Sequence, residues 1–390
     1  GFRLVNTPTF LPAYILLLSG GSDFAVGLTL SLAALGAALT PLFSASLIGH
    51  RRRVLPVGFF AGGAMRAAVL ALALAGLLLE GDAALAAAVT AMGLFGLFAG
   101  MQTVVFQTLL SKVIPVRRRG RLMGLRNFLA SLTTIAVAWV GGNLILGDPP
   151  TAAGYGWIFA LAFALTTAGL LVLALLREPE PPTVAERRSV LQYLGEMPGF
   201  MRANPAFARF VVARAVSTLG RMGLPFYILF AGSKIGLSGE TLAGLTVAFT
   251  AAASVSNLFW GALADRFGFR LCLLLAIGGW IVATLVLMLQ DSYWLTVAVF
   301  AVVGMTQEGF RLGSVSLPME FGDRDQTSLR LAIANTVSEG AGAIAPLVGG
   351  IIAGAFGYSA VFTGTAVCLL VGFGMLLSVR DPRFAAIQAS

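Results

Sequence analysis

Long apolar stretches constrain the fold of this chain more than any other feature. Each is close to the 20 or so residues that a helix needs to cross the roughly 30 Å hydrocarbon core of a bilayer. Twelve can be placed, at about 2–19, 24–48, 54–79, 83–109, 122–146, 152–176, 207–232, 241–263, 269–290, 292–317, 329–355 and 358–379. Because 58% of the residues are hydrophobic and only 11% are charged, a soluble domain with a polar shell is excluded. The sequence therefore predicts an all-α membrane protein with 12 transmembrane helices.

One connection between these stretches is much longer than the others. Residues 177–206 contain several prolines and mixed charges, and they separate six stretches from six. We therefore predict an N-terminal six-helix bundle over 1–176, a linker over 177–206 with a surface helix near Val190–Met197, and a C-terminal six-helix bundle over 207–390. The two halves also resemble repeats, because a shift of 208 positions aligns Asn127 with Asn335 and the pair Gly141, Gly142 with Gly349, Gly350.

Basic residues are distributed unequally between the two sides of the predicted membrane. The connections on one side contain a single lysine, Lys234, and several acids. Those on the other side contain Arg51, Arg52, Arg53, Lys112, Arg117, Arg118, Arg119, Arg121, Arg126, Arg177, Arg187, Arg188, Arg202, Arg209, Arg266, Arg270, Arg324, Arg330, Arg380 and Arg383. By the positive-inside rule, this side, the linker and both termini are predicted to be cytoplasmic, as in a bacterial-type inner membrane. The net charge of +9 then reflects topology and contact with anionic membrane lipid, and no nucleic-acid partner is expected.

The sequence lacks the motifs of an enzyme or of an ATP-driven pump. The two cysteines, Cys272 and Cys368, lie in apolar stretches, and the one histidine, His50, lies in a basic loop. Neither arrangement favours a disulfide, a metal site or a nucleophile with a histidine base. No glycine-rich phosphate loop precedes a Lys-Ser or Lys-Thr pair. We expect no enzyme activity, no metal and no cofactor, with a proton gradient as the energy source. Since the first residues already belong to a span, we also expect no cleavable signal peptide.

A polar segment between the eighth and ninth stretches carries the clearest motif. Residues 261–270 read GALADRFGFR, with five polar or glycine positions at fixed spacing: Gly261, Asp265, Arg266, Gly268 and Arg270. Asp265 can accept hydrogen bonds from a helix N-terminus and pair with an arginine, while glycine allows close approach of helix ends. The pattern resembles the signature loop of the major facilitator superfamily. That resemblance implies two pseudo-symmetric six-helix bundles, transport by alternating access, and gating by these five residues.

Two other segments depart from the pattern of that family. At the corresponding loop of the first half, residues 48–53 read IGHRRR, so the basic end is present and the acid is missing. The resemblance therefore implies a gate centred on Asp265 alone. In the eleventh stretch, Gly342, Ala345, Pro346, Gly349 and Gly350 resemble a glycine-proline motif that antiporters of the family carry in their fifth span. Close packing of small residues around a proline bend is the alternative explanation.

Charged residues inside the apolar stretches are rare and expensive, at roughly 2.5–3.5 kcal/mol for an arginine at a helix centre. There are six candidates: Arg66, Arg214, Arg221, Glu308, Arg311 and Glu339. Arg214 and Arg221 are seven residues apart and share one helix face, and Glu308 and Arg311 are spaced to form an ion pair. Glu339 is predicted either to carry a proton or to neutralise an arginine, and Arg66 is predicted to form a structural pair.

In the family that this chain resembles, the first, fourth, seventh and tenth spans line a central cavity. The resemblance therefore implies that the substrate-binding residues are Arg214, Arg221, Arg311, Gln102, Gln107 and Tyr14, with Asn6 and Thr7 nearby, and that Glu308 and Glu339 couple protons. A guanidinium matches a carboxylate or phosphate through its planar fork of donors, which favours an anionic or zwitterionic solute. Two alternatives are that Arg214 snorkels to the membrane surface and that Glu308 and Arg311 only close the bundle.

Three functions follow from these observations. The first is a monomeric secondary transporter that moves a small anionic or amphiphilic solute with proton coupling. The second is multidrug-type efflux of lipophilic compounds, which the motif of the eleventh stretch favours. The third is a non-transporting assembly or scaffold protein of the same fold, which the altered first-half loop keeps open.

Overall fold

The structure, a computed structural model, describes residues 2, 5, 8–48, 53–113, 116–173, 178, 190–322 and 326–379. Across those residues all regular secondary structure is helical. The chain divides into two units, one of residues 1–192 and 238–243 and the other of residues 193–237 and 244–390. The boundary between Gln192 and Tyr193 falls inside a helix of the predicted linker. Most of that helix belongs to the second unit.

The first unit contains six α-helices in the described residues. They are α2 (Phe10–Leu18), α3 (Asp23–Ile48), α4 (Leu55–Leu78), α5 (Gly81–Val113), α6 (Val116–Val140), which continues into a π-helical turn (Gly141–Ile145), and α7 (Ala152–Leu173). Helix α5 packs against both α3 and α4, and α4 also packs against α7. Asn6 and Thr7 of the first predicted span and His50, Arg51 and Arg52 of the basic loop lie outside the described residues.

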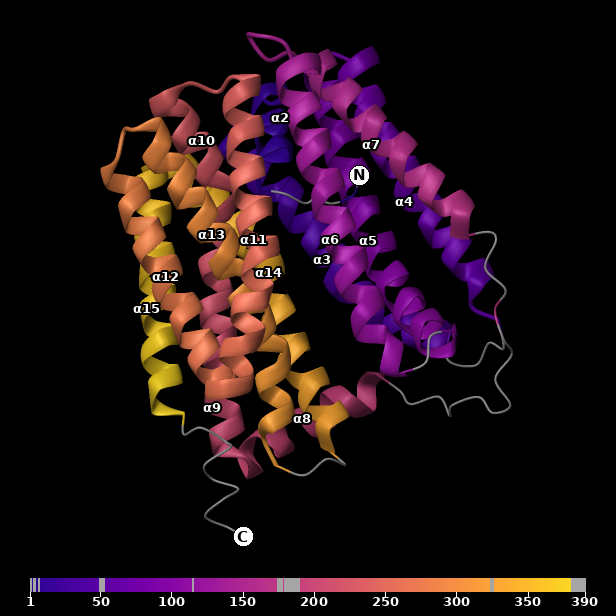
Figure 1. Ribbon diagram of the computed structural model, residues 1–390, viewed down its shortest axis with the longest axis vertical. Coiled ribbons are helices and arrows are strands. Elements are labelled where there is room, and N and C mark those ends of the chain that lie inside the picture. The colour runs from indigo at the N-terminus through magenta and orange to yellow at the C-terminus, as the bar shows by residue number, and fades with distance from the viewer. Residues whose placement is uncertain are drawn as a thin grey trace. The chain divides into compact units, whose positions relative to one another are not determined.

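The second unit contains the remaining helices. They are most of α8 (Val190–Ala203), α9 (Pro205–Leu219), a 3-10 turn η2 (Gly220–Gly223), α10 (Leu224–Ile235), most of α11 (Gly239–Phe267), α12 (Phe269–Leu289), α13 (Tyr293–Ser316), a 3-10 turn η3 (Leu317–Glu320), α14 (Thr327–Phe356) and α15 (Tyr358–Ser378). Within this unit α9 packs against α14 and α15, and α12 packs against α13 and α15 (Figure 1).

Ten helices of the described chain are long and apolar enough to cross a membrane, against the 12 predicted spans. The first predicted span is described only in part. The seventh runs from Pro205 to Ile235 but is interrupted, because Gly220 and Gly223 are poor helix formers and Pro225 lacks the N–H donor that a continuous helix needs. Breaks of this kind are typical of helices that line a cavity in membrane transporters.

Close backbone contact holds α3 and α5 together in the first unit. A Cβ atom on Gly96 of α5 would overlap the carbonyl group of Ala33 in α3. One turn earlier, Gly93 has room, since a Cβ atom on it would have Cβ of Leu32 as its nearest neighbour, at 3.9 Å. Small residues at such crossings let two membrane helices approach, and dispersion forces then stabilise the pair.

A buried aromatic cluster ties α10 to α12 in the second unit. The indole N–H of Trp280 donates to the hydroxyl of Tyr227 at 3.1 Å, and the hydroxyls of Tyr227 and Thr284 are 2.6 Å apart. Trp280 is fully buried and Tyr227 is 1% exposed, so these polar groups satisfy one another inside an apolar core. These contacts attach α10, the second part of the interrupted seventh span, to α12.

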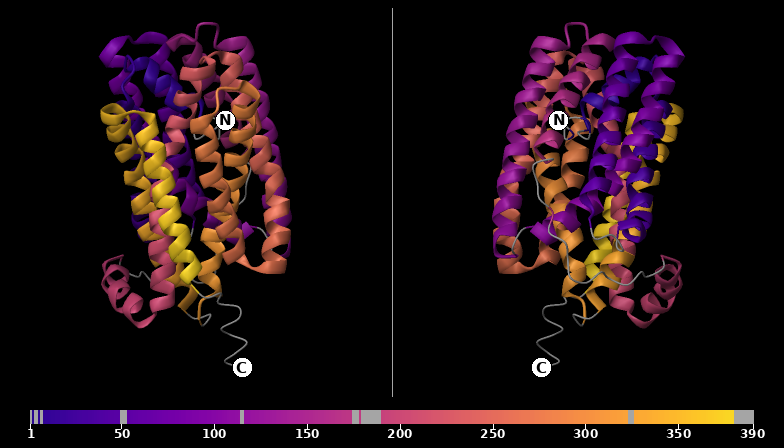
Figure 2. Two further views of the ribbon diagram at one scale, coloured as in Figure 1. Left: turned by 90° about the vertical axis from the view of Figure 1, so that its left-hand side faces the viewer. Right: turned by 90° about the vertical axis from the view of Figure 1, so that its right-hand side faces the viewer.

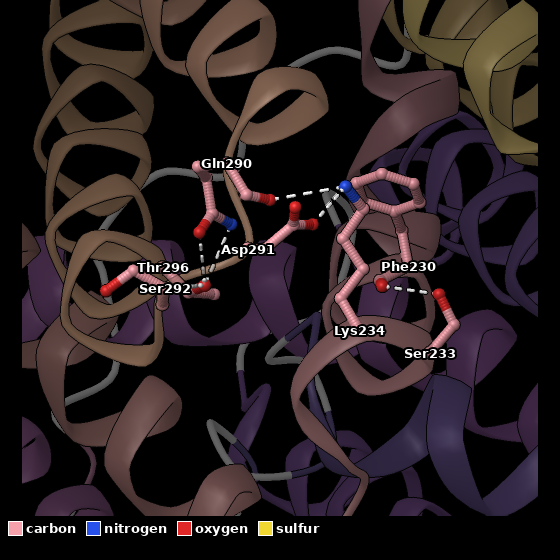
Figure 3. A network of polar contacts seen from close by, with 7 residues as sticks. All are labelled: Phe230, Ser233, Lys234, Gln290, Asp291, Ser292 and Thr296. Carbon is pink, nitrogen blue, oxygen red and sulfur yellow. Dashed lines mark hydrogen bonds and ion pairs between the residues drawn. The ribbon is translucent and has the colours of Figure 1, made fainter.

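A second polar network anchors the far end of α10 (Figure 3). The ammonium group of Lys234 is 2.5 Å from a carboxylate oxygen of Asp291 and donates to the carbonyl oxygen of Gln290 at 3.3 Å. It also lies 5.0 Å from the ring centroid of Phe230, one turn earlier. The side chains of Gln290 and Thr296 bond to each other, which closes the turn between α12 and α13. Lys234, the one basic residue predicted on its side of the membrane, is therefore paired.

The connection between α11 and α12 is shorter than the sequence indicates. Helix α11 continues through Asp265 and Arg266 to Phe267, and α12 begins at Phe269. The turn is therefore the single residue Gly268, whose φ of 90° lies in a region that side chains other than glycine rarely adopt. The predicted apolar span 241–263 lies within α11, which continues for four further residues that include Asp265 and Arg266.

The linker helix is longer than predicted. Helix α8 begins at Val190, as expected, but extends to Ala203 with Pro198 inside it. Met197, Phe200 and Met201 pack against the core of the second unit, so the helix is held by apolar contacts. It lies at an angle to the long helices of that unit, beside the start of α9 (Figure 2). Residues 179–189 of the predicted linker lie outside the described chain.

Candidate functional site

Arg214 of α9 is the most deeply buried of the predicted substrate-binding arginines. Its exposure is 5%, which contradicts the alternative that the side chain snorkels to the membrane surface. Its Nη2 donates to Oδ1 of Asn335 in α14 at 3.0 Å. Its Nε and Nη1 have no hydrogen-bond partner among the described residues. A guanidinium carries five N–H donors, so most of its hydrogen-bonding capacity is left open.

The contact between α9 and α14 continues further along both helices. A Cβ atom on Gly342 of α14 would lie 3.2 Å from Cγ2 of Thr218 and 3.6 Å from Nη1 of Arg221. The Arg214–Asn335 contact is thus followed, further along both segments, by the contacts of Gly342 with Thr218 and Arg221. The two segments therefore run parallel over this stretch.

Glu339 of α14 lies between Asn335 and Gly342 in sequence, and so between the contacts of this helix with Arg214 and with Arg221. Glu339 attracts the guanidinium of Arg214, whereas Arg221 repels it. Glu339 and Arg221 are both exposed, and in the described chain Glu339 makes no hydrogen bond or ion pair. We call Arg214, Arg221, Asn335 and Glu339 the α9–α14 polar seam. Its two cations and one anion leave it with a net positive charge.

The predicted pair on α13 forms as expected. A carboxylate oxygen of Glu308 is 2.6 Å from Nη2 and 2.7 Å from Nε of Arg311, which is a two-donor contact. The side chain of Arg311 is 60% exposed and that of Glu308 is 22% exposed. Because the two charges neutralise each other, the pair contributes no net charge to the second unit. Solute binding by Arg311 and proton coupling by Glu308 stay predictions.

In the first unit, the predicted binding residues differ in burial and in hydrogen bonding. The hydroxyl of Tyr14 is fully buried and donates to the carbonyl oxygen of Leu72 at 3.2 Å, so it joins α2 to α4. Oε1 of Gln102 is buried and has no partner among the described residues, and Gln107 is exposed. Solute binding by Gln102, Gln107 and Tyr14 stays a prediction.

Arg66 of α4 is paired, as predicted, but not with an acid. Its Nε donates to the carbonyl oxygen of Thr166 in α7 at 2.7 Å, and its Nη1 donates to that of Gly62 at 2.6 Å. Its guanidinium also lies 5.0 Å from the ring centroid of Phe2. Backbone carbonyl groups and an aromatic face thus stabilise this charge.

The five predicted gating residues lie at the α11–α12 turn of the second unit. Nη2 of Arg270 donates to the carbonyl oxygen of Leu377 in α15 at 2.9 Å, and the guanidinium of Arg266 lies 5.1 Å from the ring centroid of Phe267. Asp265 is exposed, and within the described chain it has neither a hydrogen bond nor an ion pair. A Cβ atom on Gly261 would contact nothing within 4 Å, so close packing does not explain this glycine.

Glu178 is a functional candidate that the sequence analysis missed. It follows α7, and its carboxylate accepts from the backbone N–H groups of Val54 and Leu55 at 2.8–2.9 Å, at the N-terminus of α4. Lys112 at the end of α5 donates to it at 2.7 Å, and the side chain of Glu178 is only 3% exposed. A carboxylate thus lies at the start of the third predicted span, although Glu178 is far from that span in sequence. The acids that directly follow the sixth apolar stretch were the available signal.

The environment of Glu178 lowers its pKa. Burial on its own raises the pKa of this carboxyl, but the hydrogen bonds from Lys112, Val54 and Leu55 and the positive charge of Lys112 outweigh that effect. The ionised form is therefore the one that the folded state prefers. The positive end of the α4 helix dipole acts in the same direction.

We expect Glu178→Gln to destabilise the protein by about 1–3 kcal/mol at neutral pH, because a charged acceptor of three N–H groups is lost. Since the folded-state pKa is lowered, the stabilisation is present above the ordinary carboxyl range and is lost as the pH falls through the lowered pKa. The melting temperatures of wild type and variant should therefore converge in acid. Glu80→Gln, at an exposed carboxylate, is the control. A constant difference at all pH values would contradict the role of the charge.

Helices of membrane-spanning length in two units define this chain as a multi-pass helical membrane protein. The family model described as Major Facilitator Superfamily matches residues 2–244 and again residues 210–389. The chain therefore belongs to this superfamily of membrane transporters. Membership confirms the resemblance seen in the 261–270 loop and the predicted fold class, and it identifies a transporter family rather than an enzyme family.

Individual relatives are more distant. Multidrug resistance protein MdtG of Serratia proteamaculans is 30% identical over 170 residues, which cover 42% of this chain and 40% of that protein. MdtG of Escherichia coli strain 55989 is 26% identical over 170 residues, with 42% and 40% coverage. The chain thus aligns with about two-fifths of the length of these curated relatives.

Solved structures match nearly the whole chain. The nucleoside transporter NupG, as its D323A mutant, has a TM-score of 0.75 at 14% identity, and the match covers 95% of this chain and 94% of that one. The D-xylose-proton symporter has a TM-score of 0.68 at 14% identity, with 92% and 88% coverage. Similarity at this level shows a shared fold, and the substrate has to be argued from the site.

Proposed function

We propose that this protein is a secondary transporter that moves a small anionic or amphiphilic solute across the cytoplasmic membrane of a bacterium, with coupling to protons. The observation that carries this proposal is the buried guanidinium of Arg214, which has two nitrogens without partners. Such a group inside an apolar bundle is costly unless an anion binds it for part of the cycle. Arg221, further along the α9–α14 polar seam, adds a second positive charge.

Movement of the solute would follow the alternating-access scheme of the superfamily. We propose that residues 1–176 and 207–390 act as the two halves, joined by the linker 177–206, and that the α11–α12 turn with Asp265 takes part in gating. The interruption of the seventh span beside Arg221 supports this proposal, because irregular backbone at membrane depth is tolerated where it lines a cavity.

Proton coupling would use a carboxylate that is not held in an ion pair and can therefore bind and release a proton. Glu339 is the better candidate, since in the described chain it has no ion pair, whereas Glu308 is held by Arg311. No cofactor is proposed. We further propose that both termini are cytoplasmic, that the protein acts as a monomer, and that its basic side contacts anionic membrane lipid.

A second candidate function is the efflux of lipophilic compounds. The relatives named above carry the name multidrug resistance protein, and Pro346 with its neighbouring glycines lies within α14. Accessible carboxylates would favour the binding of cations. The second unit instead has Glu339 opposite two arginines and Glu308 neutralised by Arg311, which favours the anionic class.

Ligand-dependent thermal stabilisation of the detergent-purified protein, followed by uptake into proteoliposomes, tests these functions. A ligand that binds the folded state raises the melting temperature by mass action. We expect anionic or zwitterionic solutes to stabilise wild type and Arg221→Gln to lose that effect. Stabilisation by lipophilic cations alone would establish efflux instead. A protein that neither binds nor transports any member of the panel, although folded, would support the scaffold function.

A further inference from the structure

Arg66 of α4 carries a charge that the first unit satisfies only in part. Its Nε and Nη1 donate to two backbone carbonyl oxygens, but its Nη2 makes no hydrogen bond in the described chain. No carboxylate of the described residues forms an ion pair with it. Because carbonyl oxygens supply only partial charges, a net positive charge remains near the middle of an apolar helix, where it is costly unless an anion is close.

The acids of the first unit are not in position to neutralise Arg66. Within its described helices, the carboxylates are those of Asp23 and Asp82, which lie in the first turns of α3 and α5. Glu178 is bound to Lys112 and to the N-terminus of α4. The remaining described acids lie in connections and are Glu80 and Asp148. The counter-ion of Arg66 is therefore not a side chain of the described part of this unit.

Gln102 of α5 lies beside the same guanidinium. A Cβ atom on Gly62 would be 3.1 Å from Nη1 of Arg66 and 3.6 Å from Oε1 of Gln102, so the two side chains meet over this glycine. Oε1 of Gln102 is buried, whereas its Nε2, which makes no hydrogen bond in the described chain, is accessible. The amide oxygen is thus on the side of the positive charge, as electrostatics favours, and the amide N–H groups are left for another acceptor.

The accessible groups of this pair are therefore donors. Nη2 of Arg66 and Nε2 of Gln102 each carry two N–H bonds, and neither nitrogen accepts a hydrogen bond. Two such groups, one of them charged, match the two oxygens of a carboxylate. The ring centroid of Phe2 lies 5.0 Å from the guanidinium carbon and 5.6 Å from the ring centroid of Phe95. An aromatic surface thus adjoins the donors.

We propose that Arg66 and Gln102 form an anion-binding site in the first unit, which takes the carboxylate of a small organic anion and packs its carbon part against Phe2. One carboxylate oxygen accepts from Nη2 of Arg66 and the other from Nε2 of Gln102. The bonds of Arg66 to the carbonyl oxygens of Thr166 and Gly62 hold the guanidinium in place for this ligand. The site does not involve Arg214, so it does not rest on the proposed function.

Binding of benzoate to the purified full-length protein, measured by isothermal titration calorimetry at pH 7.5, tests the site. Arg66→Gln should weaken this binding by about 10- to 100-fold and Gln102→Leu by about 2- to 10-fold, because they remove a charged and a neutral donor, respectively. Benzamide has the same shape and no charge, so it should bind more weakly and respond less to Arg66→Gln.

A matched pair of glycine variants tests the geometry without removing either side chain. Gly62→Ala would place a methyl group against Nη1 of Arg66 and Oε1 of Gln102, so both should shift and the benzoate affinity should fall. A Cβ atom on Gly63 would contact nothing within 4 Å, so Gly63→Ala should bind benzoate as the wild type does. Both variants make the same change in the same helix, and this comparison decides the matter even where Arg66→Gln does not fold.

Unchanged benzoate affinity in folded Arg66→Gln would overturn the proposal, as would equal affinities of the two glycine variants or the absence of benzoate binding to the wild type. Loss of binding in Arg214→Gln alone would also overturn it, and would favour the anion site of the proposed function. Binding that depends on Arg66 and Gln102, while Arg214→Gln leaves binding and uptake unchanged, would support this site and count against the proposed function. The two failures are therefore distinguishable.

Discussion

Arg214→Gln should reduce binding and transport of an anionic solute by about 10- to 100-fold. A hydrogen bond to a charged group contributes about 1.5–3 kcal/mol, and each 1.4 kcal/mol corresponds to a factor of ten in affinity. Glutamine keeps a polar side chain that can bond to Asn335, but it removes the positive charge and the unpaired Nε and Nη1 donors. The measurement is solute uptake into proteoliposomes, with half-saturating concentration and maximal rate determined separately.

Two further variants show whether the guanidinium itself is required. Arg214→Lys keeps the charge but lacks the planar fork of donors, so it should rescue uptake only in part. Arg209→Gln removes an exposed arginine five residues earlier on the same helix and should leave uptake near the wild-type value. Wild-type uptake by folded Arg214→Gln would show that this arginine has a structural role only.

Gly96→Ala should be among the most destabilising single-methyl changes in the first unit. The added Cβ atom would overlap the carbonyl group of Ala33, so α3 and α5 would have to separate. Overpacking of a tight contact typically costs about 1–3 kcal/mol, and here the obstructing atoms are backbone atoms that no rotamer change can move aside. We expect a fall of several degrees in melting temperature, with a larger fall or no folded protein for Gly96→Val.

Gly93→Ala provides the matched control one turn away on α5. Its Cβ would lie 3.9 Å from Cβ of Leu32, an ordinary van der Waals distance. Because alanine favours the helix over glycine by up to about 1 kcal/mol, this variant should be neutral or slightly stabilised. The two substitutions are chemically identical, so equal melting temperatures would show that α3 and α5 are not in close contact in the folded protein.

Hydrophobicity and charge pattern predicted much of the architecture. The apolar stretches predicted the fold class, and nearly all helices of the described chain lie where these stretches place them. The spacing of Glu308 and Arg311 predicted their ion pair. The start of α8 at Val190 was also predicted, although its end at Ala203 was not. Local signals of this kind depend on residues close in sequence, which explains why they were readable.

Contacts between residues far apart in sequence could not be predicted from local patterns. Glu178 and Val54 are 124 positions apart, and nothing near either residue indicates that they meet. Arg66 was expected to pair, but its partners are backbone carbonyl groups, which every residue possesses and no pattern identifies. The interruption of the seventh span is different, because Gly220, Gly223 and Pro225 lie within the span; the prediction missed this local signal since it used apolar length alone.

The sequence by itself determined that this chain is a helical membrane protein of the Major Facilitator Superfamily with scarce, and therefore informative, charges in its spans. Only the tertiary structure decided which of those charges are neutralised and which are left open. Glu308 and Arg311 satisfy each other, whereas Arg214 is buried beside an asparagine with two donor nitrogens unpaired. The physical reason is that the energy of a charge in a low-dielectric interior depends on the few atoms within hydrogen-bonding distance, and packing of helices far apart in sequence determines which atoms those are.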